Sequence, residues 1–148
     1  MWSNDDVYFM KLAIEEGEKA ERLGEVPIGA VLVIDDQLLA VGYNCPVSSN
    51  DPTAHAEIVA LRSASGWLKD YRIPKATIYV TLEPCLMCFG ALIQARVARV
   101  VFGARDSKIR VSSLLGKLRN INHHFLCEGG LLENECREQL QSFFRRRR

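Results

Sequence analysis

Two short segments constrain this chain most, because their side chains form one site only if the fold brings them together. The first is Thr53-Ala54-His55-Ala56-Glu57, and the second, about thirty residues later, is Glu83-Pro84-Cys85-Leu86-Met87-Cys88. Together they supply one imidazole, two thiols and a spare carboxylate. Zinc in proteins accepts this set of nitrogen and sulfur ligands, and three protein ligands leave its fourth position to water. The sequence therefore predicts a zinc site with His55, Cys85 and Cys88 as ligands.

The spare carboxylate belongs to Glu57. If His55 and Glu57 both lie in the first turn of a helix, two residues apart, their side chains point roughly 200° apart around its axis. One helix then cannot easily aim both groups at the same ion. Glu57 is better placed to exchange protons with a water than to bind the metal, so the pattern indicates a hydrolytic site.

Each half of this pattern has a simpler interpretation when taken alone. A lone C-x-x-C is also typical of a redox pair or of half a structural zinc site, and a lone H-x-E is usually a solvated helix face. Taken together, with Pro84 directly before Cys85, they match H-x-E…P-C-x-x-C. This pattern resembles that of the zinc-dependent nucleobase deaminases.

Composition limits the other classes of protein. The 148 residues are 48% hydrophobic and 25% charged, and we expect a single domain over residues 1–148. The acidic N-terminus lacks the basic and apolar regions of a secretory signal, and the longest apolar run, residues 26–34, is too short to span a bilayer. The cysteines outside the metal site (Cys45, Cys127 and Cys136) are expected to be reduced thiols of a cytoplasmic protein.

Basic residues are concentrated late in the chain. Residues 96–119 contain seven bases and a single acid, Asp106, and the chain ends in four arginines, although the net charge is only +1. A clustered basic surface is the electrostatic footprint of a phosphate-bearing partner. A solvated face with a frayed tail explains the charge equally well at this point.

Hydrophobic periodicity and turn residues predict the order α-β-β-α-β-α-β-(α)-β-α. We expect helices over residues 3–24, 53–66, 85–95 and 134–144, strands over residues 28–34, 38–43, 77–81, 99–102 and 125–127, and a loop over residues 44–52. Residues 108–124 are left open between a loop and a short helix. This order implies an initial antiparallel hairpin that leads into parallel βαβ units, and it puts both ligand segments at helix N-termini.

Longer stretches of the chain resemble the bacterial tRNA-specific adenosine deaminases. Besides the two ligand segments, they are Glu25-Val26-Pro27-Ile28-Gly29-Ala30-Val31, Gly42-Tyr43-Asn44, Arg99-Val100-Val101-Phe102-Gly103-Ala104-Arg105-Asp106 and Phe143-Phe144-Arg145. The resemblance covers nearly the whole chain. It implies a three-layer α/β fold of the cytidine deaminase-like type, with a mixed five-stranded sheet, an N-terminal antiparallel hairpin and helices on both faces.

The resemblance also implies a function: a homodimer that converts the wobble adenosine of a tRNA anticodon stem-loop to inosine, with one Zn²⁺ per subunit. Glu57 is then the proton shuttle and Asn44 contacts the flipped base. For Asn44 the residues alone favour an Asx turn before Pro46, although its amide suits a purine edge. Val26 is implied to line the base pocket, whereas Asp106 and Lys108 touch the backbone of the anticodon loop.

Several alternatives remain at this stage. The nearest is a zinc deaminase of a free base or nucleoside, of the guanine or cytosine type, against which the basic residues argue. A zinc-stabilised RNA-binding module without catalysis predicts four protein ligands, and Cys45 is the candidate for the fourth. A redox role for Cys85 and Cys88 leaves His55 and Glu57 unexplained. The chain also departs from the family at residues 109–113, which are bulkier and more basic than the usual Gly- and Ala-rich turn.

Overall fold

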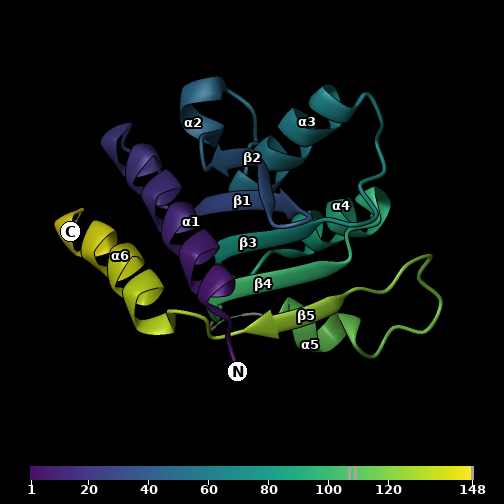
Figure 1. Cartoon of the computed structure of the whole chain (residues 1–148). Helices are drawn as coiled ribbons and strands as arrows, with labels where there is room; N and C mark the ends of the chain where they lie inside the picture. The colour runs from purple at the N-terminus through teal and green to yellow at the C-terminus, as the bar shows by residue number, and fades with distance from the viewer. Residues whose placement is uncertain (107, 109, 148) are drawn as a thin grey trace.

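The centre of the fold is a five-stranded mixed sheet (Figure 1), seen in a computed structural model that describes residues 1–106, 108 and 110–147. The strands are β1 (Gly29–Ile34), β2 (Gln37–Tyr43), β3 (Thr77–Leu82), β4 (Arg99–Ala104) and β5 (Leu126–Gly129). They lie in the order β2-β1-β3-β4-β5. β1 is antiparallel to β2 and to β3, whereas β3, β4 and β5 are parallel. The predicted hairpin and the parallel units that follow it are confirmed.

Helices cover both faces of this sheet (Figure 1). They are α1 (Asn4–Arg22), α2 (Pro46–Ser49), α3 (Ala56–Leu68), α4 (Leu86–Ala95), α5 (Val111–Leu115) and α6 (Glu133–Arg146). Successive side chains of a strand point to opposite faces of the sheet, so alternate residues of β1 belong to the two cores on its two faces. Ala30 and Leu32 pack into the core under α3 and α4, whereas Val31 and Val33 join the core under α1 and α6. The predicted three-layer α/β fold is therefore confirmed.

Element boundaries differ from the prediction around the first ligand segment. α3 begins at Ala56 with His55 as its N-cap, not at residue 53. Thr53 instead donates its backbone N–H and its hydroxyl to Asp51 Oδ1, at 2.9 and 2.7 Å. This Asx turn competes with helix formation. The expected loop 44–52 also contains the short helix α2, and the open segment 108–124 contains α5.

A close approach between β2 and α3 positions the start of that helix. A Cβ atom on Gly42 would lie 2.3 Å from the carbonyl oxygen of Ala56, so only glycine allows the first turn of α3 to rest on the strand. Because Ala56 directly follows His55, this packing also fixes the depth at which the imidazole sits above the sheet.

None of the helices in the described part of the chain combines the length and the apolar character needed to cross a bilayer.

Candidate metal centre and substrate site

The proposed ligands come from the N-terminal ends of two neighbouring helices. His55 is the N-cap of α3, and its carbonyl oxygen accepts the backbone N–H of Val59 at 3.0 Å. Cys85 is the N-cap of α4 and accepts Phe89 N–H in the same way, also at 3.0 Å. Cys88 lies in the first turn of α4, three residues after Cys85, which puts both sulfurs on one side of the helix. The expectation that both ligand segments sit at helix N-termini is confirmed.

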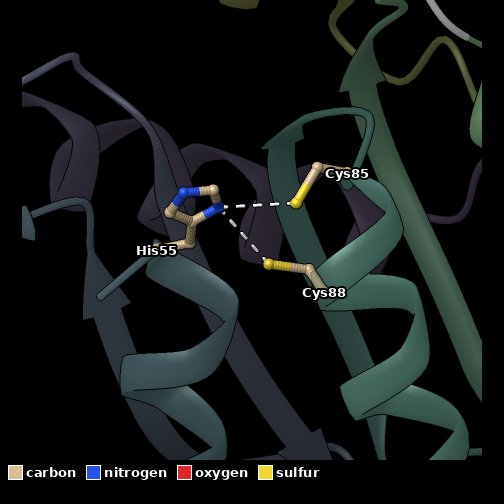
Figure 2. Close-up of side chains that lie close together, drawn as sticks. All are labelled: His55, Cys85 and Cys88. Atoms are coloured by element: carbon tan, nitrogen blue, oxygen red, sulfur yellow. Dashed lines mark hydrogen bonds between the residues drawn. The ribbon is translucent and has the colours of Figure 1, made fainter. Parts of the chain in front are cut away.

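The three side chains converge on one point (Figure 2). Nδ1 of His55 lies 3.5 Å from the Sγ atom of Cys85 and 3.5 Å from that of Cys88. A tetrahedral zinc ion, with Zn–N near 2.05 Å and Zn–S near 2.3 Å, separates a nitrogen and a sulfur ligand by about 3.6 Å. The donor atoms of this chain therefore fit zinc without rearrangement. Within the described residues, neither Glu57 nor Cys45 belongs to this group of three.

The two thiols are electrostatically coupled. The hydrogen bond from the Cys88 thiol, together with the neighbouring His55, lowers the pKa of Cys85 to about 5. That same interaction, together with burial, raises the pKa of Cys88. One proton is thus shared by the pair near neutral pH in the absence of a cation. A bound divalent ion would release that proton, because cysteine binds zinc as the thiolate.

Glu57, the second residue of α3, is buried beside the three ligands. Burial raises the pKa of its carboxyl group to about 7, and its carboxyl group also hydrogen-bonds the Cys88 thiol. A carboxyl group in such a place can both accept and return a proton near neutral pH.

Asn44 is buried where β2 ends. Its backbone N–H donates to the carbonyl oxygen of Ile28 at 3.0 Å, and the N–H of the next residue, Cys45, donates to Ala54 at 2.9 Å. These two bonds hold Asn44 between the start of β1 and the residue before His55. The backbone of this segment is thus linked directly to the segment that carries His55.

The other predicted substrate residues line one groove. Val26, Asp106 and Lys108 lie along a cavity of about 320 Å³ that α6 borders with Leu140 and Phe144. Asp106 also lines a second, largely apolar cavity of about 380 Å³, which includes Cys85. The backbone N–H of Lys108 donates to Asp106 Oδ1 at 2.9 Å. Asp106 thus lies between the metal centre and the groove beside α6.

Part of the predicted basic cluster has partners inside the protein. Arg99 Nη1 lies 2.8 Å from Asp6, and Arg99 Nε lies 2.7 Å from Glu128. At the C-terminus Arg146 pairs with Glu21 at 2.7 Å, and Arg147 donates to the Gly24 carbonyl oxygen. Paired arginines contribute less to a positive surface than their number suggests.

Two buried carboxylates near the site went unassigned in the sequence analysis. Glu25 accepts the backbone N–H groups of Val47 and Ser48, at 3.4 and 2.6 Å, and so ties the first turn of α2 to the segment of Val26. Glu83 accepts hydrogen bonds from the segment that follows β4. Their positions inside the motifs E-V-P and L-E-P-C were the available signal. Their partners lie more than twenty residues away, which local patterns cannot reveal.

The class of protein follows from a comparison with known families. The profile of the cytidine and deoxycytidylate deaminase zinc-binding region matches residues 3–104. The matched range includes His55, Glu57, Cys85 and Cys88, and a zinc-binding region agrees with the donor geometry described above. The fold and the site are thus those of a zinc-dependent deaminase.

Individual relatives narrow the class to one family. The tRNA-specific adenosine deaminase of Buchnera aphidicola subsp. Schizaphis graminum is 44% identical, over 100% of this chain and 99% of that protein. That of Bacillus subtilis is 46% identical, over 95% and 89%. A structure solved in a study of A-to-I editing by tRNA:A34 deaminases superposes with a TM-score of 0.86 at 41% identity, over 90% of this chain and 99% of the other. The chain belongs to the family of tRNA-specific adenosine deaminases.

Proposed function

We propose that this protein hydrolytically deaminates adenosine to inosine at the wobble position of a tRNA anticodon, as a single deaminase domain over residues 1–148. The observation that carries the proposal is the convergence of His55 Nδ1 with two sulfurs, at 3.5 Å from each. It occurs beside a buried carboxyl group in a chain whose near-full-length relatives are tRNA-specific adenosine deaminases.

His55, Cys85 and Cys88 would hold one Zn²⁺ per subunit. When bound, zinc acts as a Lewis acid that lowers the pKa of water towards 7, so that hydroxide is available at neutral pH. Three protein ligands favour this role over a structural one, because a closed structural site takes four. The N-terminal ends of α3 and α4 contribute partial positive charge that stabilises the two thiolates.

Glu57 moves the proton in this reaction. Its carboxylate accepts a proton from the attacking water, whose oxygen forms a bond to C6 of the adenine ring. Glu57 delivers this proton to ring N1. It then takes the remaining proton from the new hydroxyl group on C6 and passes it to the exocyclic amine, so that the C6–N6 bond breaks, a carbonyl forms at C6 and ammonia leaves. The carboxylate of Glu57 is regenerated, and the net change is the addition of water and the loss of ammonia.

The neighbouring residues would bind the RNA. Asn44 is assigned to the polar edge of the flipped base, because its amide both donates and accepts, and Val26 to the apolar wall beside it. Asp106 and Lys108 are assigned to the backbone of the anticodon loop, along the groove that α6 borders. A homodimer in the cytoplasm is part of the same proposal, since editing of tRNA takes place there.

The test is a direct comparison of substrates. The zinc-loaded protein is incubated with a tRNA anticodon stem-loop, and in parallel with free adenosine, guanine and cytosine, while ammonia release is measured. Sequencing of total tRNA after incubation then scores inosine at the wobble position. We expect turnover on the stem-loop and little on the free compounds. Strong turnover of a free base, with none on the RNA, would replace this proposal by the free-base alternative.

A further inference from the structure

One buried carboxylate beside the metal centre has no part in the chemistry described so far. Glu83 follows the last residue of β3 and lies two residues before the ligand Cys85, and its side chain is 3% exposed. Burying a carboxylate is costly unless hydrogen bonds satisfy its oxygens. The groups that donate hydrogen bonds to the Glu83 carboxylate therefore indicate what this side chain does in the structure.

Among the described residues, the hydrogen bonds that the Glu83 side chain accepts come from Asp106 and Ser112, the two ends of the segment 106–112. Its Oε1 atom accepts the backbone N–H of Asp106 at 3.0 Å. Its Oε2 atom accepts the backbone N–H of Ser112 at 3.2 Å, and also the Ser112 hydroxyl. Each oxygen thus holds one end of the segment. The backbone N–H of Glu83 donates to the Ala104 carbonyl oxygen at 2.8 Å, which joins the same two regions again.

Among the described residues of this segment, Val111 alone is buried. In α5, Ser113 and Leu114 are exposed, as are Lys108 and Arg110 just before that helix. The side-chain bond from Ser112 to Glu83 gives the first turn of α5 a fixed attachment.

We propose that Glu83 is a positioning residue that holds the segment bearing Asp106 and Lys108 in register with the metal ligands. The inference rests on the proposed function, in which this segment contacts the anticodon loop. Glu83 then acts on RNA binding through the backbone, and proton transfer remains with Glu57. A glutamine at this position would supply only one acceptor oxygen, so one end of the segment would lose its partner.

The experiment compares Glu83→Gln, Ser112→Ala and the double variant in the zinc-loaded protein. KM and kcat are measured on the stem-loop, zinc content by metal analysis, and amide hydrogen exchange for the peptide that covers residues 104–113. The matched control is Asp6→Asn, a buried carboxylate at the far end of the sheet with no bond to this segment.

We expect Glu83→Gln to raise KM between about tenfold and a hundredfold, the range for losing a hydrogen bond to a charged group. We expect kcat to stay within about twofold, zinc content to remain equal, and exchange to accelerate in residues 104–113 alone. Ser112→Ala should change KM and exchange in the same direction by less. It should add little to Glu83→Gln, because both remove the same interaction.

Unchanged exchange in residues 104–113, or a KM no different from that of the parent protein, would overturn the positioning role. So would equal changes in the Asp6→Asn control. If Glu83→Gln does not fold, Ser112→Ala decides alone, since it leaves the buried carboxylate in place. Should the parent protein fail to edit the stem-loop, the proposed function fails, and the exchange result still decides what Glu83 holds.

Discussion

The backbone N–H of Cys45 donates to the carbonyl oxygen of Ala54, with 2.9 Å between nitrogen and oxygen. Cys45 follows Asn44, and Ala54 precedes His55, the proposed metal ligand. One hydrogen bond thus joins the residue after the proposed base contact to the residue before the proposed metal ligand. The base contact and the metal share a rigid frame, as precise catalysis requires.

Replacing Asn44 by alanine should therefore impair substrate binding without affecting the metal. We expect kcat/KM on the stem-loop to fall between about tenfold and a hundredfold, because the alanine leaves the polar edge of a buried base unpaired. Zinc content should stay at the parent level. The control is Val47→Ala, a change of an exposed side chain in α2, which should leave kcat/KM unchanged. An equal fall in both variants would mean that the loop, and not the amide, matters.

Replacing Glu57 by glutamine should separate metal binding from chemistry. The amide cannot take up a proton, so we expect kcat to fall on the order of 10²- to 10⁴-fold. Metal analysis should still find zinc, because the ligand atoms of the three-residue cluster do not include Glu57. If zinc disappears in step with activity, Glu57 is a ligand and the proposed proton transfer is wrong.

Removing the metal should destabilise the protein as well as inactivate it. A bound ion stabilises the folded state through its own affinity, so a strong chelator should lower the Tm and abolish editing. Added Zn²⁺ should restore both. Cys88→Ser should behave like the chelated protein. Cys45→Ala is the matched control and should keep one zinc per chain; loss of zinc there would support a closed, four-ligand site.

Most of the fold could be predicted from the sequence, because the patterns that indicate helices and strands lie within short segments of the chain. The helix predicted to begin at residue 3 is present as α1, and a capping box between Ser3 and Asp6 starts it. Likewise, the apolar run of β1 is buried as expected, since a strand covered on both faces must be apolar throughout. The convergence of the two ligand segments was predictable because both motifs lie where a helix begins, next to a strand end.

The features that could not be predicted depend on hydrogen-bond partners that local sequence patterns do not show. The sequence predicts a helix that begins at residue 53, but the hydroxyl of Thr53 donates to Asp51, and α3 begins three residues later at Ala56. Arg99 counted towards a basic RNA surface, yet its guanidinium bonds a carboxylate 93 positions away. The role of Glu83 was hidden for the same reason. Such partners lie next to each other only in the folded sheet, so local sequence patterns do not reveal them.

The Asp6–Arg99 pair joins α1 to the sheet far from the metal centre. Tyr79 donates its hydroxyl to Asp6 at 2.7 Å, and Arg99 also reaches Glu128 at 2.7 Å. Burial alone would raise the pKa of the Asp6 carboxyl group. The hydrogen bonds from Arg99, Tyr79 and the backbone N–H of Ser3 outweigh burial and hold that pKa well below its ordinary value.

Asp6→Asn should therefore lower the free energy of unfolding at pH 7 by about 2–3 kcal/mol. Because folding lowers the pKa of Asp6, its contribution is complete above the unfolded value of about 3.9 and is lost progressively as the pH falls from there towards the folded value. In urea titrations between pH 7 and pH 3, the parent protein should begin to lose more stability than Asp6→Asn below about pH 4, so that the gap between the two curves narrows. Asp5→Asn, a change of an exposed neighbour, should track the parent curve. Parallel curves for Asp6→Asn and the parent would show that the ionised carboxylate does not stabilise the fold.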